Sequence, residues 1–190
     1  MRNARCYLLL IATTAACFAQ GPSVVSVVGG ADYSDAVSVG IPLGSIFTIE
    51  GSDLAPSVAQ ATGLPLPTTL NGLTVQIWDS AGSAVLGVCP LWYVSPTQVN
   101  AVLPSSLAAG TYDLSVSILT ASPFGNIPLS TPRVQILATN GRFAPFTLGS
   151  RGFGPAVVQQ YDSAGGPFLN QLTAAAPTGS VLVLWGTGLV

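Results

Sequence analysis

The stretch Tyr112–Leu119, with the sequence YDLSVSIL, decides the fold class of this chain. Its apolar and polar residues alternate strictly, with Tyr112, Leu114, Val116 and Ile118 on one side and Asp113, Ser115 and Ser117 on the other. A period of two is typical of a β-strand that has one buried and one exposed face. The sequence therefore predicts a sheet in which the four apolar residues are buried and the serines are exposed.

Further runs of alternating or β-branched residues extend this pattern in both directions, separated by Gly, Pro and Asn. The expected strands are Ser23–Val28, Ser45–Glu50, Leu73–Trp78, Ala84–Val88, Leu91–Val94, Gln98–Leu103, Arg133–Leu137, Ala156–Gln160 and Ser180–Trp185. Helix is expected only in short pieces, at Ser105–Ala109 and Pro56–Ala61. Many short strands at this spacing indicate an antiparallel β-sandwich.

Turn residues mark the connections between these strands. Trp78–Gly82 (WDSAG) and Tyr161–Gly165 (YDSAG) both place an aromatic residue before Asp-Ser-Ala-Gly. Because Asp can accept a hydrogen bond from the backbone two residues on and Gly tolerates a positive φ, both segments are expected to connect hairpins. Leu64–Pro67 (LPLP) is expected to be an extended connection, since proline cannot donate to a central ladder.

The first residues have the pattern of a secretory signal peptide. Arg2 and Arg5 give the positive region, Cys6–Phe18 gives the apolar region, and Ala19 precedes the expected cleavage point. One alternative is an uncleaved membrane anchor, for which the apolar run falls short of about 18 residues. Another is lipid attachment at Cys17. Cleavage predicts an exported protein, either secreted or held at the cell surface.

The charge content of the chain is unusually low. Only 6% of its 190 residues are charged, whereas an ordinary soluble domain has about 25% charged residues. Two of the five cationic residues lie in the signal, so three remain against seven acidic residues, and the chain has no His. So few cations offer no basic stripe for phosphates, which argues against nucleic-acid binding. Cys89 is the only cysteine outside the signal, so no internal disulfide is expected.

The chain contains an internal repeat. Pro42–Leu54 (PLGSIFTIEGSDL) aligns with Pro177–Leu189 (PTGSVLVLWGTGL) at a constant offset of 135 residues. Pro, Gly, Ser, Gly and Leu coincide, and the strand between them stays apolar. A strand opened by Pro-x-Gly and closed by Gly is a generic pattern, so chance resemblance is the alternative. We interpret the match as a true repeat whose second copy begins a second β module.

These segments resemble known families. Gly44–Leu54 is similar to the first strand of IPT/TIG immunoglobulin-like domains, and Val94–Pro104 and Ala109–Val116 resemble later strands of that module. Over about residues 37–190 the chain also resembles an uncharacterised secreted C-terminal domain family of Acidobacteria of the Solibacter type. The shared segments are Pro42–Ile46, Leu66–Gly72, Tyr93–Asn100 and Pro177–Leu189. The resemblance implies an immunoglobulin-like fold, export and an incomplete second module, because family members continue past Gly-Thr-Gly-Leu. It implies no activity.

The residue types exclude most catalytic sites. Without His, no Ser-His-Asp or Cys-His nucleophile and no His metal site can be assembled. Paired carboxylates are the remaining catalytic route, and Glu50 and Asp53 are the nearest pair. We interpret them as polar residues of a turn at a solvent-exposed edge. Asp32 and Asp35 are spaced too loosely for a calcium loop. The sequence therefore predicts no catalytic residue, no cofactor and no metal ligand.

The aromatic residues give the remaining candidate site. Trp92 and Tyr93 are candidates for stacking on a glycan. They are adjacent, so they point to opposite faces of a strand and at most one is buried. Trp78 and Trp185 end apolar strands, and for them we expect packing in or beside the core. Cys89 is expected to be a small buried hydrophobic residue rather than a crosslink to another chain.

Together these observations predict an all-β chain. Its expected parts are a signal peptide (1–19), a lead-in strand or linker (20–36), an immunoglobulin-like antiparallel β-sandwich (37–138) and the start of a second, truncated β module (139–190). The expected role is non-enzymatic, as a structural or interaction unit with an extracellular protein or glycan as partner. A carbohydrate-binding module and an accessory domain of an exported hydrolase are the alternatives. No transmembrane segment is expected after signal cleavage, and the apolar C-terminal strand predicts weak self-association.

Overall fold

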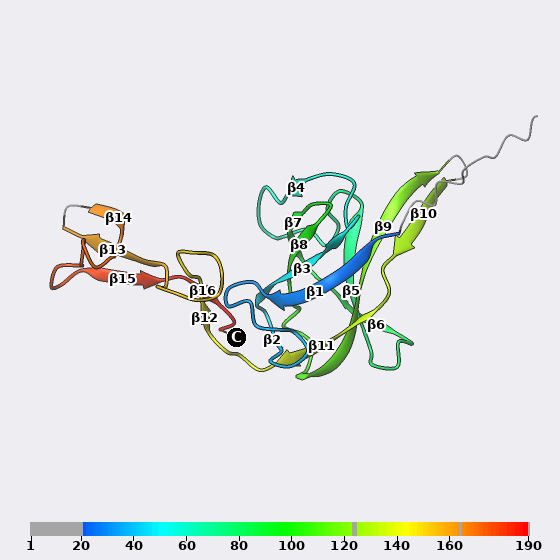
Figure 1. Cartoon of the computed structure of the whole chain (residues 1–190), viewed down its shortest axis with the longest axis horizontal. Helices are drawn as coiled ribbons and strands as arrows, with labels where there is room; N and C mark the ends of the chain where they lie inside the picture. Colours follow the sequence, from blue (N-terminus) through cyan, green and yellow to red (C-terminus); the bar gives the residue numbers. More distant parts are fainter. Residues whose placement is uncertain (1–20, 123–124, 164, 190) are drawn as a thin grey trace, which may run out of the picture.

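The computed structural model describes residues 21–122, 125–163 and 165–189, which form an all-β structure (Figure 1). No helix occurs in these ranges. The two predicted helical pieces are therefore wrong: Ser105–Ala109 forms turns and a bend, and Pro56–Ala61 contains the two-residue strand β4. Segments this short gain too few hydrogen bonds to offset the cost of helix nucleation. The predicted signal peptide, with Cys17 and the cleavage point, lies outside the described residues.

Five antiparallel strands form the first sheet, in the order β1-β3-β8-β7-β4. Their bounds are β1 Ser23–Gly29, β3 Ile46–Ser52, β8 Gln98–Val102, β7 Leu91–Val94 and β4 Ala59–Gln60. Strand β3 pairs with β1 along one edge and with β8 along the other. The segment expected as a lead-in therefore contributes β1 to this sheet.

The second sheet has the order β2-β11-β9-β5-β6, with β10 also paired to β9. Its strands are β2 Ile41–Pro42, β11 Val134–Thr139, β9 Gly110–Ser122, β5 Leu73–Trp78, β6 Val85–Val88 and β10 Gly125–Ser130. Only β2 and β11 run parallel; the other pairs are antiparallel. The long strand β9 pairs with β5 along one edge and with β11 and then β10 along the other.

The hydrophobic core lies between these two sheets in a sandwich-like arrangement, and residues 21–139 are called the first unit below. Fully buried residues of the first sheet are Phe47, Ile49, Leu91, Val94, Val99 and Ala101, and those of the second are Leu73, Val75, Ile77, Leu114, Val116 and Ile136. Burying one Val, Leu, Ile or Phe side chain stabilises a protein by about 1.5–3 kcal/mol. This cluster therefore supplies most of the stability of the first unit.

Burial along β9 follows the predicted alternation in part, because Tyr112 and Ser117 are both half-buried and Ser115 is buried. Leu114, Val116 and Ile118 are buried and Tyr112 is half-buried. Ser115, which the alternation predicts to be exposed, is only 4% exposed. The indole Nε1 of Trp78 on the neighbouring strand donates a hydrogen bond to Ser115 Oγ at 2.9 Å. An aromatic side chain thus covers this part of the outer face.

Residues 142–189, called the C-terminal unit below, form two small sheets. β12 (Ala144–Pro145) pairs with β16 (Gly186–Thr187), and β13 (Val158–Asp162) lies between β14 (Gly165–Leu169) and β15 (Val181–Leu184). Figure 1 shows the three-stranded sheet extending away from the two large sheets. The predicted Asp-Ser-Ala-Gly turns connect hairpins, the first between β5 and β6 and the second between β13 and β14.

Several contacts attach the C-terminal unit to the first unit, among them a hydrogen bond from Arg142 Nη2 to Ser34 Oγ at 3.0 Å. Arg142 Nη2 lies 3.1 Å from Asp32 Oδ2 in an ion pair. The backbone N–H of Ile46, at the start of β3, donates to Thr187 Oγ1 at 3.0 Å. Gly152 lies so close to the first unit that a Cβ atom there would be 2.2 Å from the carbonyl oxygen of Asp32. The C-terminal unit therefore rests on the first unit through its base, next to β3.

Candidate functional site

The predicted aromatic pair lies on β7 in the first sheet. Trp92 is 44% exposed and Tyr93 is half-buried, whereas Leu91 and Val94 on either side are fully buried. The pairing of β7 with β8 shifts between Leu91 and Tyr93, so Trp92 is an extra residue on β7, as in a β-bulge. A bulge interrupts the alternation of a regular strand, and neither aromatic side chain enters the core.

Tyr93 begins a row of polar residues across the outer face of the first sheet. It lies opposite Asn100 on β8, and Asn100 lies opposite Thr48 on β3. Asn100 Oδ1 accepts hydrogen bonds from Thr48 Oγ1 at 3.2 Å and from Gln98 Nε2 at 2.8 Å. Residue type pointed to Tyr93 but not to the other members of this row. Their signal was the position of Asn100 between the apolar residues of an alternating strand.

A groove of about 490 Å³ adjoins β7 on the side of the proline-rich connection that follows β4. It is lined by Gln60, Ala61, Thr62, Gly63, Pro65, Pro67 and Leu70. Two backbone hydrogen bonds hold this connection against β7, from Ala61 N to Trp92 O at 2.9 Å and from Leu91 N to Pro67 O at 2.7 Å. Trp92, Tyr93, the polar row and this groove are together called the β7 surface below.

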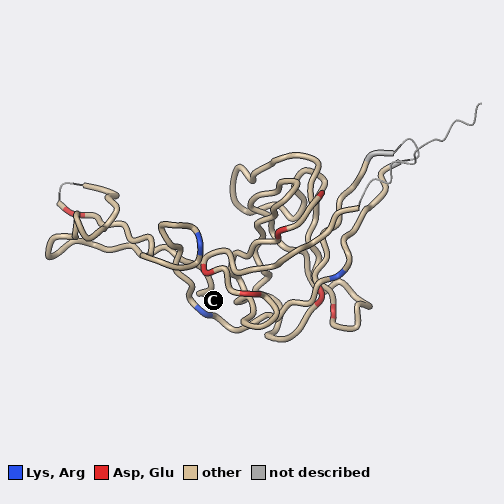
Figure 2. The backbone as a smooth tube through the Cα atoms, viewed as in Figure 1, with Lys and Arg blue, Asp and Glu red and all other residues tan. Residues whose placement is uncertain are grey.

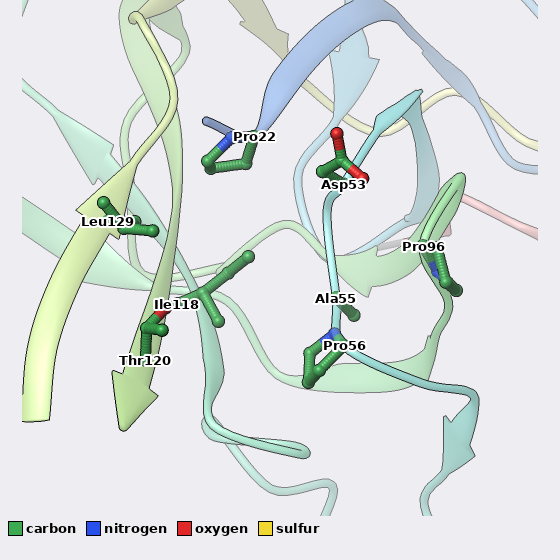
Figure 3. Close-up of a pocket in the computed structure, with 8 residues that line it drawn as sticks. All are labelled: Pro22, Asp53, Ala55, Pro56, Pro96, Ile118, Thr120 and Leu129. Carbon is green, nitrogen blue, oxygen red and sulfur yellow. The ribbon is translucent and has the colours of Figure 1, made fainter. Parts of the chain in front are cut away.

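A second cavity, of about 330 Å³, lies at one end of the first unit (Figure 3). Figure 3 shows Ile118, Thr120 and Leu129 from β9 and β10 on one side, and the segment from Asp53 to Pro56 with Pro96 on the other. Its walls are mostly apolar, and Asp53 is the one charged residue that lines it. A lone carboxylate with no acid or base beside it in the lining offers no acid–base pair.

Glu50 and Asp53, the predicted nearest carboxylate pair, have separate surroundings. Glu50 Oε2 accepts a hydrogen bond from Ser26 Oγ on the adjacent strand at 2.8 Å. Asp53 follows the end of β3 with a positive φ of 53° and faces the second cavity. Glu50 therefore contributes a hydrogen bond between β1 and β3, and Asp53 contributes to the wall of the second cavity.

Asp32 and Asp35, considered for calcium, each hold a turn together. Asp32 bonds Ser34 and forms the ion pair with Arg142. Asp35 Oδ1 accepts hydrogen bonds from the backbone N–H groups of Val37 and Ser38. The bonds from Ser38 are the main cause that lowers the pKa of the Asp35 carboxyl. Within the described ranges, no three His, Cys, Asp or Glu residues are grouped so that they could hold a metal ion.

The remaining candidates divide between core and surface. Cys89 is fully buried, and burial raises the pKa of its thiol to about 12. Trp78 is half-buried beneath Arg133, whose Cζ atom lies 4.0 Å from the centre of the indole ring. Trp185, predicted to pack in or beside the core, is 48% exposed, and its Nε1 donates to Gln159 Oε1 at 2.8 Å. That prediction is wrong: Trp185 lies in the C-terminal unit, whereas the buried core cluster of the described residues lies in the first unit.

Figure 2 shows the blue Lys and Arg positions at separate places along the described backbone. Arg133 stacks on Trp78 and donates to the Gly82 carbonyl at 2.7 Å, while Arg142 pairs with Asp32. A surface that binds a phosphate backbone presents clustered Lys and Arg side chains.

Comparison with known proteins gives a distant structural match. No family model and no curated protein matches the chain. A solved structure described as a "Putative bacterial DNA binding protein" from Bacteroides vulgatus is similar with a TM-score of 0.39 and 20% identity. The similarity covers 62% of this chain and 47% of that one, so this chain spans about half the length of that protein. A likeness at this level carries no argument about fold or function. In the described residues, no helix has the length and apolarity to cross a membrane.

Proposed function

We propose that this chain is a non-enzymatic interaction module of an exported protein, built on an immunoglobulin-like β-sandwich. The observation that carries the proposal is the β7 surface. There an exposed Trp92 and the half-buried Tyr93 lie beside amide and hydroxyl groups whose positions are fixed by neighbouring strands. Aromatic residues with a polar partner are enriched at binding surfaces.

The roles of the carboxylates support a non-enzymatic function. Asp32 and Asp35 stabilise turns, Asp79 accepts hydrogen bonds within the β5–β6 hairpin, and Glu50 bonds a serine on the next strand. A pair of catalytic carboxylates needs two such groups facing one cleft. The second cavity is lined by one carboxylate, that of Asp53.

The immunoglobulin-like assignment and the exported location rest on the sequence resemblance. Gly44–Leu54 has the pattern of the first IPT/TIG strand, and in this chain that segment contains β3. Two sheets around one core are what such a module requires. Export rests on the signal pattern of the first nineteen residues.

A glycan is the second candidate ligand, and the groove beside β7 favours it over a flat protein surface. Trp92 and Tyr93 supply aromatic rings for the apolar face of a sugar. Gln60 in the groove and Asn100 in the polar row supply amide groups for its hydroxyls.

A glycan array with matched variants tests the interaction site. If the β7 surface binds a glycan, Trp92→Ala and Tyr93→Ala should each weaken binding at least about fivefold. Trp185→Ala is the control, because Trp185 is similarly exposed but lies in the C-terminal unit. Equal losses in all three variants, or a loss in Trp185→Ala alone, would contradict the assignment of the β7 surface.

The non-enzymatic reading has its own test. A screen of polysaccharide and glycoside substrates should show no turnover that depends on Glu50 or Asp53. A turnover that Glu50→Gln or Asp53→Asn removes, in a variant that keeps its unfolding midpoint, would overturn this reading.

A further inference from the structure

The two copies of the internal repeat begin with the same turn. The N–H groups of Ser45 and Ser180 each donate to the carbonyl of the proline three residues earlier, at 3.1 and 3.2 Å. The glycines before them, Gly44 and Gly179, both have positive φ angles, of 69° and 91°. The match in sequence is therefore also a match in backbone conformation.

The copies also end alike. Asp53 and Gly188 are separated by the offset of the repeat, and both have positive φ angles, of 53° and 90°. Aspartate is among the residues that tolerate this region, and glycine adopts it freely. Between these two special positions lies β3 in the first unit, and β15 followed by the two-residue strand β16 in the C-terminal unit.

A strand earlier in the chain pairs with each copy in the same orientation. β1 runs antiparallel to β3, and β13 runs antiparallel to β15. In the first unit the other edge of β3 is covered by β8. In the C-terminal unit the sheet order is β14-β13-β15, so within the described residues the other edge of β15 carries no strand.

Alternation of the ladder shows which groups of β3 face β8. Leu103 N donates to Ser45 O at 2.9 Å, which places the carbonyl group of Ser45 on the β8 side. Hydrogen-bonded pairs recur every second residue in an antiparallel ladder. The backbone groups of Phe47 and Ile49 therefore also face β8, opposite Ala101 and Val99.

The same alternation identifies which backbone N–H and C=O groups of β15 face the edge without a strand. Trp185 N donates to Val157 O at 3.1 Å, so Trp185 faces β13, and so does Val183 two residues earlier. The N–H and C=O groups of Leu182 and Leu184 then point to the open edge. At the repeat offset these two residues correspond to Phe47 and Ile49, the residues whose backbone groups face β8 in the first unit.

Side-chain exposure differs sharply between the two copies. Phe47 and Ile49 have no exposed surface, whereas Leu182 is 53% and Leu184 is 49% exposed. Natural sheet edges are usually protected by charged residues, proline or a bulge. Val181–Leu184 (VLVL) contains neither a charge nor a proline, and its pairing with β13 is regular. This edge has the features of a strand that is normally covered.

We propose that the open edge of β15 accepts an extended strand with the chemistry of β8, supplied by a partner polypeptide. In β8 (QVNAV), small or β-branched apolar residues at Val99 and Ala101 alternate with uncharged polar ones. The accepted strand would place such apolar residues beside Leu184 and Leu182. Neither β8 nor β15 carries a charge, so the pairing meets no electrostatic repulsion. This site is separate from the β7 surface, and its failure would leave the proposed function untouched.

The chain itself provides the probe for this site. A fluorescent synthetic peptide with the sequence of residues 95–103 (SPTQVNAVL) is titrated with the full chain, and its anisotropy is measured. Binding should protect the amides of Leu182 and Leu184 from hydrogen exchange. Leu184→Pro removes a donor from the open edge without removing a bond to β13, and should weaken binding at least about tenfold.

Methylated peptides give the matched control. In the first unit the N–H of Val102 donates to Pro90 O, on the β7 side, and alternation places the N–H of Asn100 on the same side. N-methylation at the position of Ala101 should therefore weaken binding at least about tenfold, while N-methylation at Asn100 should change it less than about threefold.

Three results would overturn the proposal. The first is no binding of the unmodified peptide at millimolar concentration of the chain. The second is equal loss of binding from both methylated peptides. The third is an oligomer in sedimentation that Leu184→Pro dissolves, because the edge would then be occupied by a second copy of this chain.

Discussion

Replacing Val116 with Asp should remove most or all of the stability of the first unit at neutral pH. Val116 has no exposed surface and lies opposite Val75 in the middle of the second sheet. Its N–H donates to Thr131 Oγ1 at 3.0 Å, and its carbonyl accepts the N–H of Thr131 at 2.9 Å. The residues of the surrounding core cluster are hydrophobic and include no cation. A carboxylate at this position would be buried without a partner.

The size of the effect follows from two contributions. Val116→Ala alone removes two buried carbon atoms, worth about 1.6 kcal/mol, and leaves a cavity that brings the loss of stability to about 2–3 kcal/mol. An unpaired buried carboxylate costs several kcal/mol more, of the order of 3–5 kcal/mol. Domains of this size are stable by about 5–15 kcal/mol, so the aspartate variant should be largely unfolded or close to it.

Urea unfolding followed by tryptophan fluorescence and circular dichroism measures this loss at two pH values. Burial would raise the pKa of the new carboxyl in the folded state above its value in the unfolded chain. The destabilisation is therefore greatest above the folded-state pKa and becomes smaller as the pH falls through it. Val116→Asn is the uncharged control, whose loss of stability should not show this pH dependence.

A second control lies on the same strand. Ser117 is half-buried on the opposite side of β9, so Ser117→Asp should cost no more than about 1 kcal/mol. The reasoning would be refuted if Val116→Asp unfolded at the same urea concentration as the unmodified chain at neutral pH, or if both aspartate variants lost equal stability.

Three further predictions concern the attachment of the units, the buried thiol and the covered serine. Gly152→Ala should loosen the C-terminal unit and speed proteolysis between the units, because the new Cβ would lie 2.2 Å from a carbonyl oxygen and the φ of this residue is +74°. Gly149→Ala is the control and should leave the rate of proteolysis unchanged, because no atom lies within 4 Å of its Cβ position. Cys89 should react with a thiol reagent only on unfolding. Because burial raises the pKa of its thiol from 9.0 to about 12, the free energy of unfolding should fall as the pH rises above 9. Cys89→Ala should lack this fall. Trp78→Phe removes the donor to buried Ser115 and should cost about 1–3 kcal/mol in denaturant unfolding, and an unchanged midpoint would contradict that bond.

Alternation in the sequence was enough to find the central strands. Leu73–Trp78 is a strand with the predicted bounds, because its side chains alternate between core and surface. Two strands that alternation did not predict are β10 (GNIPLS) and β14 (GGPFL), which contain glycine and proline. Both pair along one edge only, and proline is tolerated in edge strands. Each pairs with the strand just before it in the chain, but the glycine and proline within it interrupt the pattern by which a strand is recognised from sequence.

The candidate site was only partly predictable for a similar reason. Trp92 and Tyr93 could be named from residue type, but their common exclusion from the core depends on a pairing shift opposite β8. The exposure of Trp185 depends on the absence of a covering sheet over β15 in the described structure. In both cases the residue type can be read from the sequence, whereas the exposure of its side chain depends on the neighbouring strand or sheet.

The parallel pairing of β2 with β11 has a consequence for how the chain folds as it is made. Ile41 lies beside Ala138 in this ladder, so almost the whole first unit separates the two partners. A ribosome adds roughly 5–20 residues per second, and β11 therefore emerges seconds after β2, β3 and β5. Over that interval the early strands have no complete second sheet to pack against, and long-range pairing of this kind is slow. A chaperone that holds the nascent chain until residue 139 has emerged should raise the yield of folded protein, and one that releases it earlier should not.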